Sequence, residues 1–99
     1  MTNKEYLKDL QKGDLIATAY DNCFRLGFFC KFGLKKALYY YDVIHFTYRG
    51  GIRTFKAKPW RVTTSFVGRV LKVDRQQLTD KQIELVDKAE YYLKTNGLL

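Results

Sequence analysis

The 99-residue sequence is poor in the residues that build metal centres and disulfide frameworks, with only two cysteines and one histidine. Cys23 and Cys30 match neither a disulfide-rich scaffold nor a metal-ligand spacing. A zinc site needs more cysteine and histidine ligands than this chain offers. The sequence therefore predicts no metal and no cofactor.

Long apolar runs are also missing. None approaches the roughly 20 residues that cross a bilayer. Residues 1–5 lack the apolar stretch of a signal peptide. We expect a cytoplasmic protein without a membrane partner.

Signals for catalysis are equally sparse. His45 lies in a strand-like run, and no recognisable motif places a serine or cysteine beside it. The acidic residues of the middle segment are scattered singly, so no paired-carboxylate site is indicated. Gly50-Gly51 does not lead into a helix with the Lys-Ser/Thr pair of a phosphate loop. The sequence predicts that the protein is not an enzyme.

What the chain does contain is aromatic residues and positive charge. Phe, Tyr and Trp make up 16% of the chain, enough to fill a modest core, and the length predicts a single domain over residues 1–99. The net charge is +8, and residues 14–79 carry twelve Lys or Arg against four Asp. The excess charge therefore lies in the middle segment, which favours anionic partners.

The two ends of the chain read as helices. Thr2 and Glu5 form a capping-box pattern, which predicts a short helix over about residues 2–12 that ends at Gly13. Thr79 and Gln82 form a second such pattern, which predicts a longer helix over about 79–96, closed by Asn96-Gly97.

Residues 14–73 between these ends read as strands. We expect strands over 14–20, 24–32, 37–48, 52–57 and 66–73, with a hairpin turn at Gly50-Gly51. The run over 37–48 is either one bent strand or two strands that break at Asp42. Pro59 should lie on an edge or in a loop. Five short strands with close turns predict an α+β protein, mainly β, built on a small antiparallel barrel with one helix at each end.

Three segments of this middle region resemble the small Src-homology-like or KOW-like barrels. Residues 12–17 (KGDLIA) look like the first strand of such a barrel, residues 24–33 (FRLGFFCKFG) like the second, and residues 66–73 (FVGRVLKV) like the closing strand. Small accessory proteins of tailed bacteriophages are often similar. The resemblance implies a binding module, in the cytoplasm of a bacterial host if a phage encodes it.

Basic and aromatic residues alternate in three stretches of the middle segment, a pattern typical of surfaces that bind phosphates and stack on bases. We take as candidate binding residues Arg25, Lys35, Lys36, Tyr39, Tyr41, Arg49, Arg53, Lys56, Lys58, Trp60, Arg61 and Arg69. Trp60 is either an exposed aromatic anchor or a plug under the barrel mouth. At least one of Tyr39, Tyr40 and Tyr41 should line the core, since Tyr40 faces away from the other two.

Two functions fit this pattern. The first is a barrel that binds nucleic acid. The second is a phage-type inhibitor or adaptor, similar to an anti-CRISPR protein, that binds an acidic surface of a host protein or defence complex through Trp, Tyr and Arg hot spots. The sequence leaves the oligomeric state open.

Overall fold

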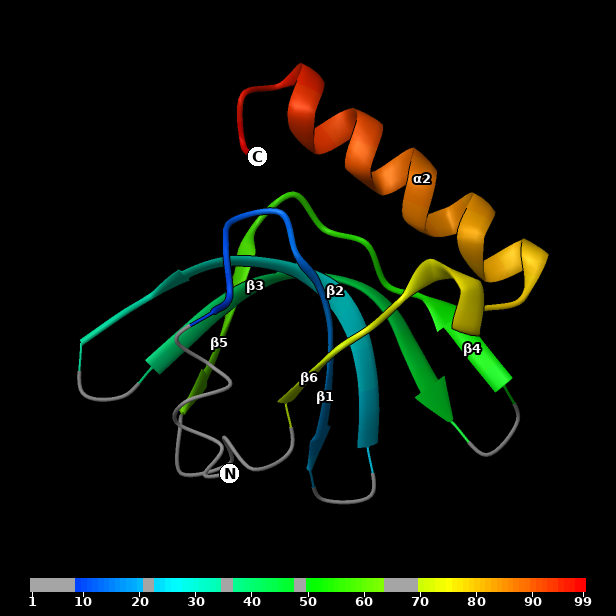
Figure 1. Ribbon diagram of the computed structural model, residues 1–99, viewed down its shortest axis with the longest axis horizontal. Coiled ribbons are helices and arrows are strands. Elements are labelled where there is room, and N and C mark those ends of the chain that lie inside the picture. The colour runs from blue at the N-terminus through cyan, green and yellow to red at the C-terminus, as the bar shows by residue number, and fades with distance from the viewer. Residues whose placement is uncertain (1–8, 21–22, 35–36, 48–49, 64–69) are drawn as a thin grey trace.

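The computed structural model describes residues 9–20, 23–34, 37–47, 50–63 and 70–99. These residues form a curved antiparallel sheet with one long helix lying across it (Figure 1). In chain order the elements are β1 (Leu15–Tyr20), β2 (Cys23–Phe32), β3 (Ala37–Thr47), β4 (Gly50–Arg53), β5 (Pro59–Thr63), β6 (Val70–Lys72), the 3-10 helix η2 (Arg75–Gln77) and α2 (Asp80–Thr95).

The described strands form a six-stranded sheet in the order β4-β3-β2-β1-β6, with β5 also paired to β3. β4 pairs with the end of β3 from Ile44 to Thr47, and β5 pairs with its beginning from Ala37 to Tyr41. Pro59 is the first residue of β5. Proline is tolerated at this position although it has no N–H to donate to the neighbouring strand. An antiparallel α+β architecture is thus established, while closure into a barrel stays a prediction.

The long run after residue 36 forms one strand, which is the first of the two alternatives that the sequence left open. β3 runs unbroken from Ala37 to Thr47, and the irregularity appears in its pairing with β2. Leu26 pairs with Ile44 and Gly27 with Asp42, so β3 contributes one extra residue at this point. A bulge of this kind bends the strand and increases its twist without ending it.

Gly27 allows this bulge because the two strands approach closely there. A Cβ atom at Gly27 would lie 2.1 Å from the carbonyl oxygen of Tyr41 and 2.9 Å from a ring carbon of Tyr40. No side chain fits at such distances, so a glycine is required.

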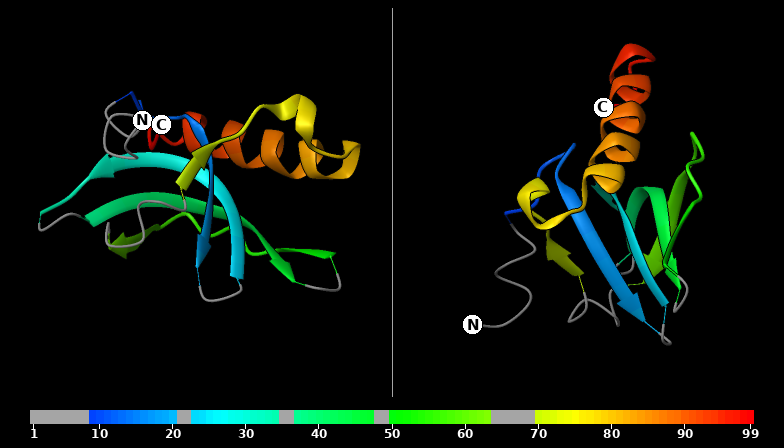
Figure 2. Two further views of the ribbon diagram at one scale, coloured as in Figure 1. Left: turned by 60° about the horizontal axis from the view of Figure 1, so that its bottom comes forward. Right: turned by 90° about the vertical axis from the view of Figure 1, so that its right-hand side faces the viewer.

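Apolar side chains gather on both faces of the sheet. On one face, Val86, Ala89 and Leu93 of α2 pack against a cluster that includes Phe28 and Tyr41. Figures 1 and 2 show α2 crossing this face. A smaller cluster is made up of Leu10, Ile16, Phe29, Leu38, Tyr40 and Val70. Because successive residues of a strand face opposite ways, Tyr40 and Tyr41 belong to different clusters.

The C-terminal helix confirms the sequence prediction closely. The hydroxyl of Thr79 accepts a hydrogen bond from the backbone N–H of Gln82 at 3.2 Å. In turn, the side-chain oxygen of Gln82 accepts one from the backbone N–H of Thr79 at 2.9 Å. Gly97 has φ of +72°, and the N–H of Leu98 donates to the carbonyl of Leu93 at 2.8 Å. No helix within the described ranges is long and apolar enough to cross a membrane.

The helix expected over residues 2–12 is not found in the part of it that the structure describes. Residues 1–8 lie outside the described residues, and residues 9–13 are turns and irregular chain. The N–H of Gln11 donates to Asp14 Oδ2 at 2.8 Å, and Gly13 has φ of +96°. This Asp14 turn replaces helical hydrogen bonds, and it places Leu10 in the smaller cluster.

We expect Gly27→Ala to lower the free energy of unfolding by about 1–3 kcal/mol, the usual cost of forcing atoms into a packed interior. Urea denaturation followed by circular dichroism would measure the change. Lys31→Ala, at an exposed position of the same strand, is the control and should cost less than about 1 kcal/mol. Equal stability of the two variants would contradict the close approach at Gly27.

Candidate functional site

The segment between β4 and β5 is held at two points. The N–H of Thr54 donates to the carbonyl of Val43 at 2.9 Å. The ring of Phe55 packs edge-on against Tyr92 of α2, with 5.6 Å between ring centroids. Because side chains alternate along extended chain, Phe55 turned toward α2 leaves Thr54 and Lys56 on the other side.

These residues border a pocket with a volume of about 610 Å³. Its lining combines an aromatic ring, a proline, three basic side chains and two smaller polar ones. The lining residues are Arg25, Asp42, Thr54, Lys56, Lys58, Pro59 and Trp60. We call this hollow the Trp60 pocket.

An ion pair between Arg25 and Asp42 forms part of its wall. The Nη1 atom of Arg25 donates to Asp42 Oδ2, and both side chains are largely withdrawn from solvent. Burial raises the pKa of the Asp42 carboxyl, although Arg25, the Thr54 hydroxyl and the charge of His45 oppose this by lowering it. Asp42 Oδ1 and Thr54 Oγ1 are buried without a hydrogen bond of good geometry to any described residue.

Trp60 lies on the rim of the pocket. Its side chain keeps 45% of its surface exposed. The guanidinium carbon of Arg25 lies 5.5 Å from the centre of its ring, which is within cation–π range. Of the two interpretations that the sequence left open, the exposed anchor therefore fits better than the plug.

The pocket has an excess of positive charge. Arg25 is neutralised by Asp42, while Lys56 and Lys58 are both exposed beside Trp60. An anion approaching Trp60 thus meets two further cations. The wall between them is polar at Asp42 and Thr54 and apolar at Pro59 and Trp60.

The structure brings together four of the twelve residues proposed from the sequence: Arg25, Lys56, Lys58 and Trp60. Tyr39 pairs with Arg61 across β3 and β5, one position along from the pair of Tyr40 and Trp60. Because side chains alternate along a strand, Tyr39 and Arg61 face away from the Trp60 side chain. The ammonium of Lys31 lies 5.6 Å from the ring centre of Tyr39 on that other face.

Tyr41 does not fit the proposed stacking role. It is 4% exposed and packs in the cluster under α2. Burial, together with the neighbouring Cys30 thiol, raises the pKa of its phenol. Four other proposed residues, Lys35, Lys36, Arg49 and Arg69, lie outside the described residues, and for Arg53 only the backbone is described.

Asp42 and Thr54 belong to the pocket but were not among the proposed residues. In the sequence Asp42 is a lone acid inside a long β-prone run, where it marks a possible break, and Thr54 is an ordinary strand residue. A usable signal was the lone acid inside a long β run, because a charged residue there needs a partner. The partner, Arg25, is set by the bulge in the pairing of β2 and β3.

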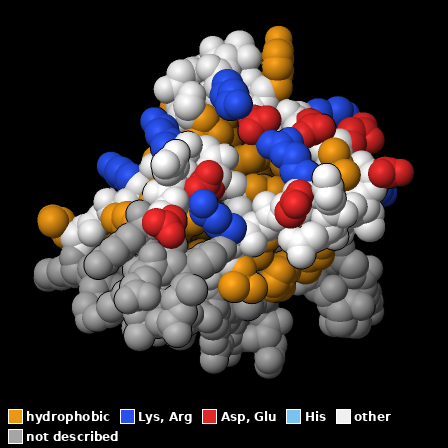
Figure 3. All heavy atoms as spheres, in the orientation of Figure 1, with side chains coloured by type: hydrophobic (Ala, Val, Ile, Leu, Met, Phe, Trp, Pro, Cys, Tyr) orange, Lys and Arg blue, Asp and Glu red, His pale blue; other side chains and the backbone are white. Residues whose placement is uncertain are grey.

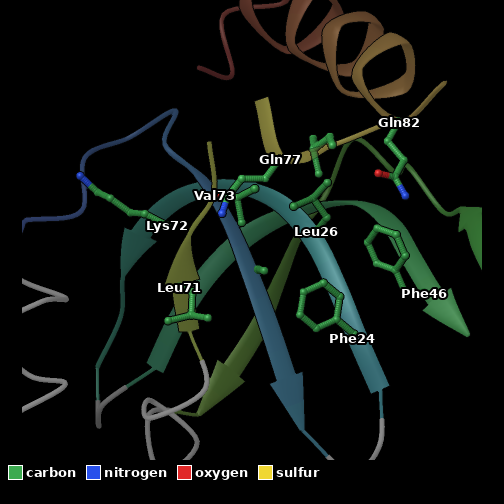
Figure 4. A pocket seen from close by; sticks show the side chains of 10 residues that line it. Phe24, Leu26, Phe46, Leu71, Lys72, Val73, Gln77 and Gln82 are labelled. Carbon is green, nitrogen blue, oxygen red and sulfur yellow. The ribbon is translucent and has the colours of Figure 1, made fainter. Parts of the chain in front are cut away.

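A second hollow, with a volume of about 370 Å³, lies between the sheet and the start of α2 (Figure 4). Its lining is mainly apolar and includes Phe24, Phe46 and Leu71, with Gln77 and Gln82 at the side of the helices. Phe24 is 40% exposed and Leu71 is 57% exposed. We call it the Leu71 hollow.

The α2 side of the molecule carries charges of both signs. Figure 3 shows Lys and Arg side chains interspersed with Asp and Glu over this face. Arg75 pairs with Asp87 and, at 2.8 Å, with Glu90, and Lys88 pairs with Glu84 at 3.0 Å. The charges on this face are therefore balanced, whereas the Trp60 pocket has an excess of positive charge.

Neither a metal site nor a nucleophile–base arrangement stands out in the described part of the chain. No group of three or more His, Cys, Asp or Glu that could hold a metal ion occurs among those residues. His45 lies on β3, paired with Arg25 on β2 and Ile52 on β4. Cys30 is half-buried next to Tyr41.

Comparisons of this chain with protein-family models, curated proteins and solved structures return no match.

The raised pKa of Asp42 predicts how stability depends on pH. The folded protein holds this proton more tightly than the unfolded chain, whose pKa is 3.8. The stabilisation that protonated Asp42 gives the folded state is therefore fully present below pH 3.8 and is lost as the pH rises through the pKa of the folded protein. The unfolding free energy of the wild type minus that of Asp42→Asn should fall as the pH rises from about 3 through the raised pKa of Asp42.

Urea titrations of both proteins across this range would measure the difference. Comparison with Asp42→Asn cancels the titration of the other carboxyl groups. A difference that rises with pH would mean that the attraction of Arg25 outweighs burial, contrary to this prediction.

Proposed function

We propose that this protein is a non-enzymatic basic module that binds nucleic acid through the surface around Trp60. The observation that carries this proposal is an exposed tryptophan beside Lys56 and Lys58, on a pocket whose wall holds Arg25. Phosphates are attracted to the lysines, and a base can stack on the ring.

The energies of these contacts are sufficient for binding. Stacking of a base on an aromatic side chain contributes roughly 1–3 kcal/mol. Each phosphate contact adds affinity that weakens as salt rises. One stacked base and a few phosphate contacts give weak to moderate affinity, to which other basic residues of the middle segment would add.

The resemblance to small Src-homology-like barrels supports the same proposal. Such barrels present sheet faces and loops to nucleic acids or to other proteins. A closed barrel in this chain would join β6 to the β4 and β5 side of the sheet. A bacteriophage accessory protein acting in the host cytoplasm would meet abundant nucleic acid, so origin and function are consistent with each other.

Neutralising the two lysines tests the proposal. Lys56→Gln combined with Lys58→Gln should weaken binding to a generic oligonucleotide at low salt and reduce the slope of log affinity against log salt by about 1–2. Fluorescence anisotropy of a labelled oligonucleotide between about 50 and about 200 mM salt would measure both. The control, Lys81→Gln with Lys88→Gln on α2, changes the net charge equally at exposed sites.

Equal losses in the two double variants would show that only net charge matters, against a site at Trp60. Absence of binding by the wild type at about 50 mM salt would refute the nucleic-acid function.

A second candidate function is an inhibitor or adaptor that binds a host protein, and the Leu71 hollow favours it. Exposed apolar side chains around a hollow are typical of protein interfaces. In this form the partner contacts the Leu71 hollow, whereas the sequence alone predicted contact through Trp, Tyr and Arg. Protein bound from a nuclease-treated bacterial lysate should then be lost with Leu71→Lys and kept with Trp60→Ala. The nucleic-acid function predicts the reverse dependence for a purified oligonucleotide.

A further inference from the structure

We propose that the Trp60 pocket receives one unpaired nucleotide, with its base against the Trp60 ring and its phosphate at Lys56 and Lys58. This inference rests on the proposed nucleic-acid function. It goes further by naming the ligand class, a single strand, and the pocket that distinguishes it from a duplex.

The size of the pocket fits such a group. Its volume of about 610 Å³ lies within the range of pockets that bind small molecules, roughly 300–1,000 Å³. A base within a duplex is stacked on both faces and paired along its edge, so it cannot enter a pocket of this kind. An unpaired base exposes its faces and its edge together.

Trp60 is prepared for stacking before any ligand arrives. The Arg25 guanidinium lies over its ring, and Arg25 is itself held by the ion pair with Asp42. The indole therefore has a support on one side while nearly half of its surface stays exposed. A side chain fixed in this way loses less conformational freedom on binding, which increases affinity.

The polar wall suits a polar occupant better than an apolar side chain of a protein. Asp42 and Thr54 line the pocket together with Pro59 and Trp60. The Thr54 hydroxyl interacts with the Asp42 carboxyl, and the oxygens Asp42 Oδ1 and Thr54 Oγ1 have almost no surface exposed to solvent. A wholly apolar occupant would desolvate this wall further, which is costly, whereas the edge of a base is polar.

Charge at the pocket selects the rest of the ligand. Lys56 and Lys58 are exposed beside Pro59 and Trp60, where the sugar–phosphate chain of a stacked nucleotide would pass. A neutral aromatic ligand would use the ring and leave both ammonium groups without a counter-charge. A nucleotide satisfies the ring, the polar wall and the lysines at once.

The protein contains a built-in reporter, because Trp60 is its only tryptophan. We expect a short unstructured single strand to quench the Trp60 emission in a saturable titration. The same sequence as a blunt duplex, and ribose 5-phosphate, which has the phosphate but no base, should leave the emission nearly unchanged at equal concentration.

A pair of variants separates the pocket from general charge, and the affinity of each is measured by anisotropy of labelled oligonucleotides. Trp60→Ala should remove the preference for single strand over duplex, and Tyr91→Ala, at a 74% exposed aromatic of α2, should keep it.

The outcomes distinguish this inference from the function on which it rests. Equal affinity for single strand and duplex, with Trp60 emission unchanged by both, would overturn the pocket and leave nucleic-acid binding intact. Quenching by ribose 5-phosphate as strong as that by the single strand would overturn the base-binding part. Failure to bind either nucleic acid at low salt would overturn both.

Discussion

The close approach of β2 and β3 at Gly27 is the constraint on which the site depends. Gly27 has no side chain, so the Tyr41 carbonyl can lie where a Cβ atom would otherwise be. The bulge at this point sets Asp42 opposite Gly27, and Arg25 lies two residues before Gly27 on the same face. Diagonal neighbours across two strands are within reach of a long side chain. The bulge thus places Asp42 within reach of Arg25, and Arg25 in turn supports Trp60.

Local signals in the sequence were enough for the elements whose ends are fixed by local chemistry. The second helix follows from the capping box of Thr79 and Gln82 and from the glycine cap at Gly97, because each is complete within a few residues. The same pattern at Thr2 and Glu5 did not extend a helix to residue 12, since Asp14 forms a turn with Gln11 and the sheet takes Leu10 into its core. A capping pattern cannot reveal such tertiary competition.

The site could be predicted only in part, for a similar reason. The alternation of basic and aromatic residues identified Arg25 in one stretch, and Lys56, Lys58 and Trp60 in the stretch around Pro59. The same pattern also included Tyr41, whose side chain is buried under α2. The face of the sheet on which Tyr41 lies depends on the bulge and on the position of α2, and no local pattern encodes either. Asp42 and Thr54 escaped notice because each gains its role from a residue far away in the sequence: Asp42 from Arg25, and Thr54 from the backbone of Val43.

The ion pair of Arg25 and Asp42 is hard to explain by stability alone. Withdrawing two charges from water costs several kcal/mol per ion, and well-packed apolar residues often do as well or better. Burial raising the pKa of Asp42 is a sign of that cost. The larger apolar cluster under α2 already supplies a core, with Val86 and Leu93 fully buried. A costly pair that lines the same pocket as an exposed tryptophan and two lysines is better explained by what it holds in place. It fixes one cation against the Trp60 ring and keeps a polar wall behind it, which are the features that an anionic ligand with a polar, planar group would require.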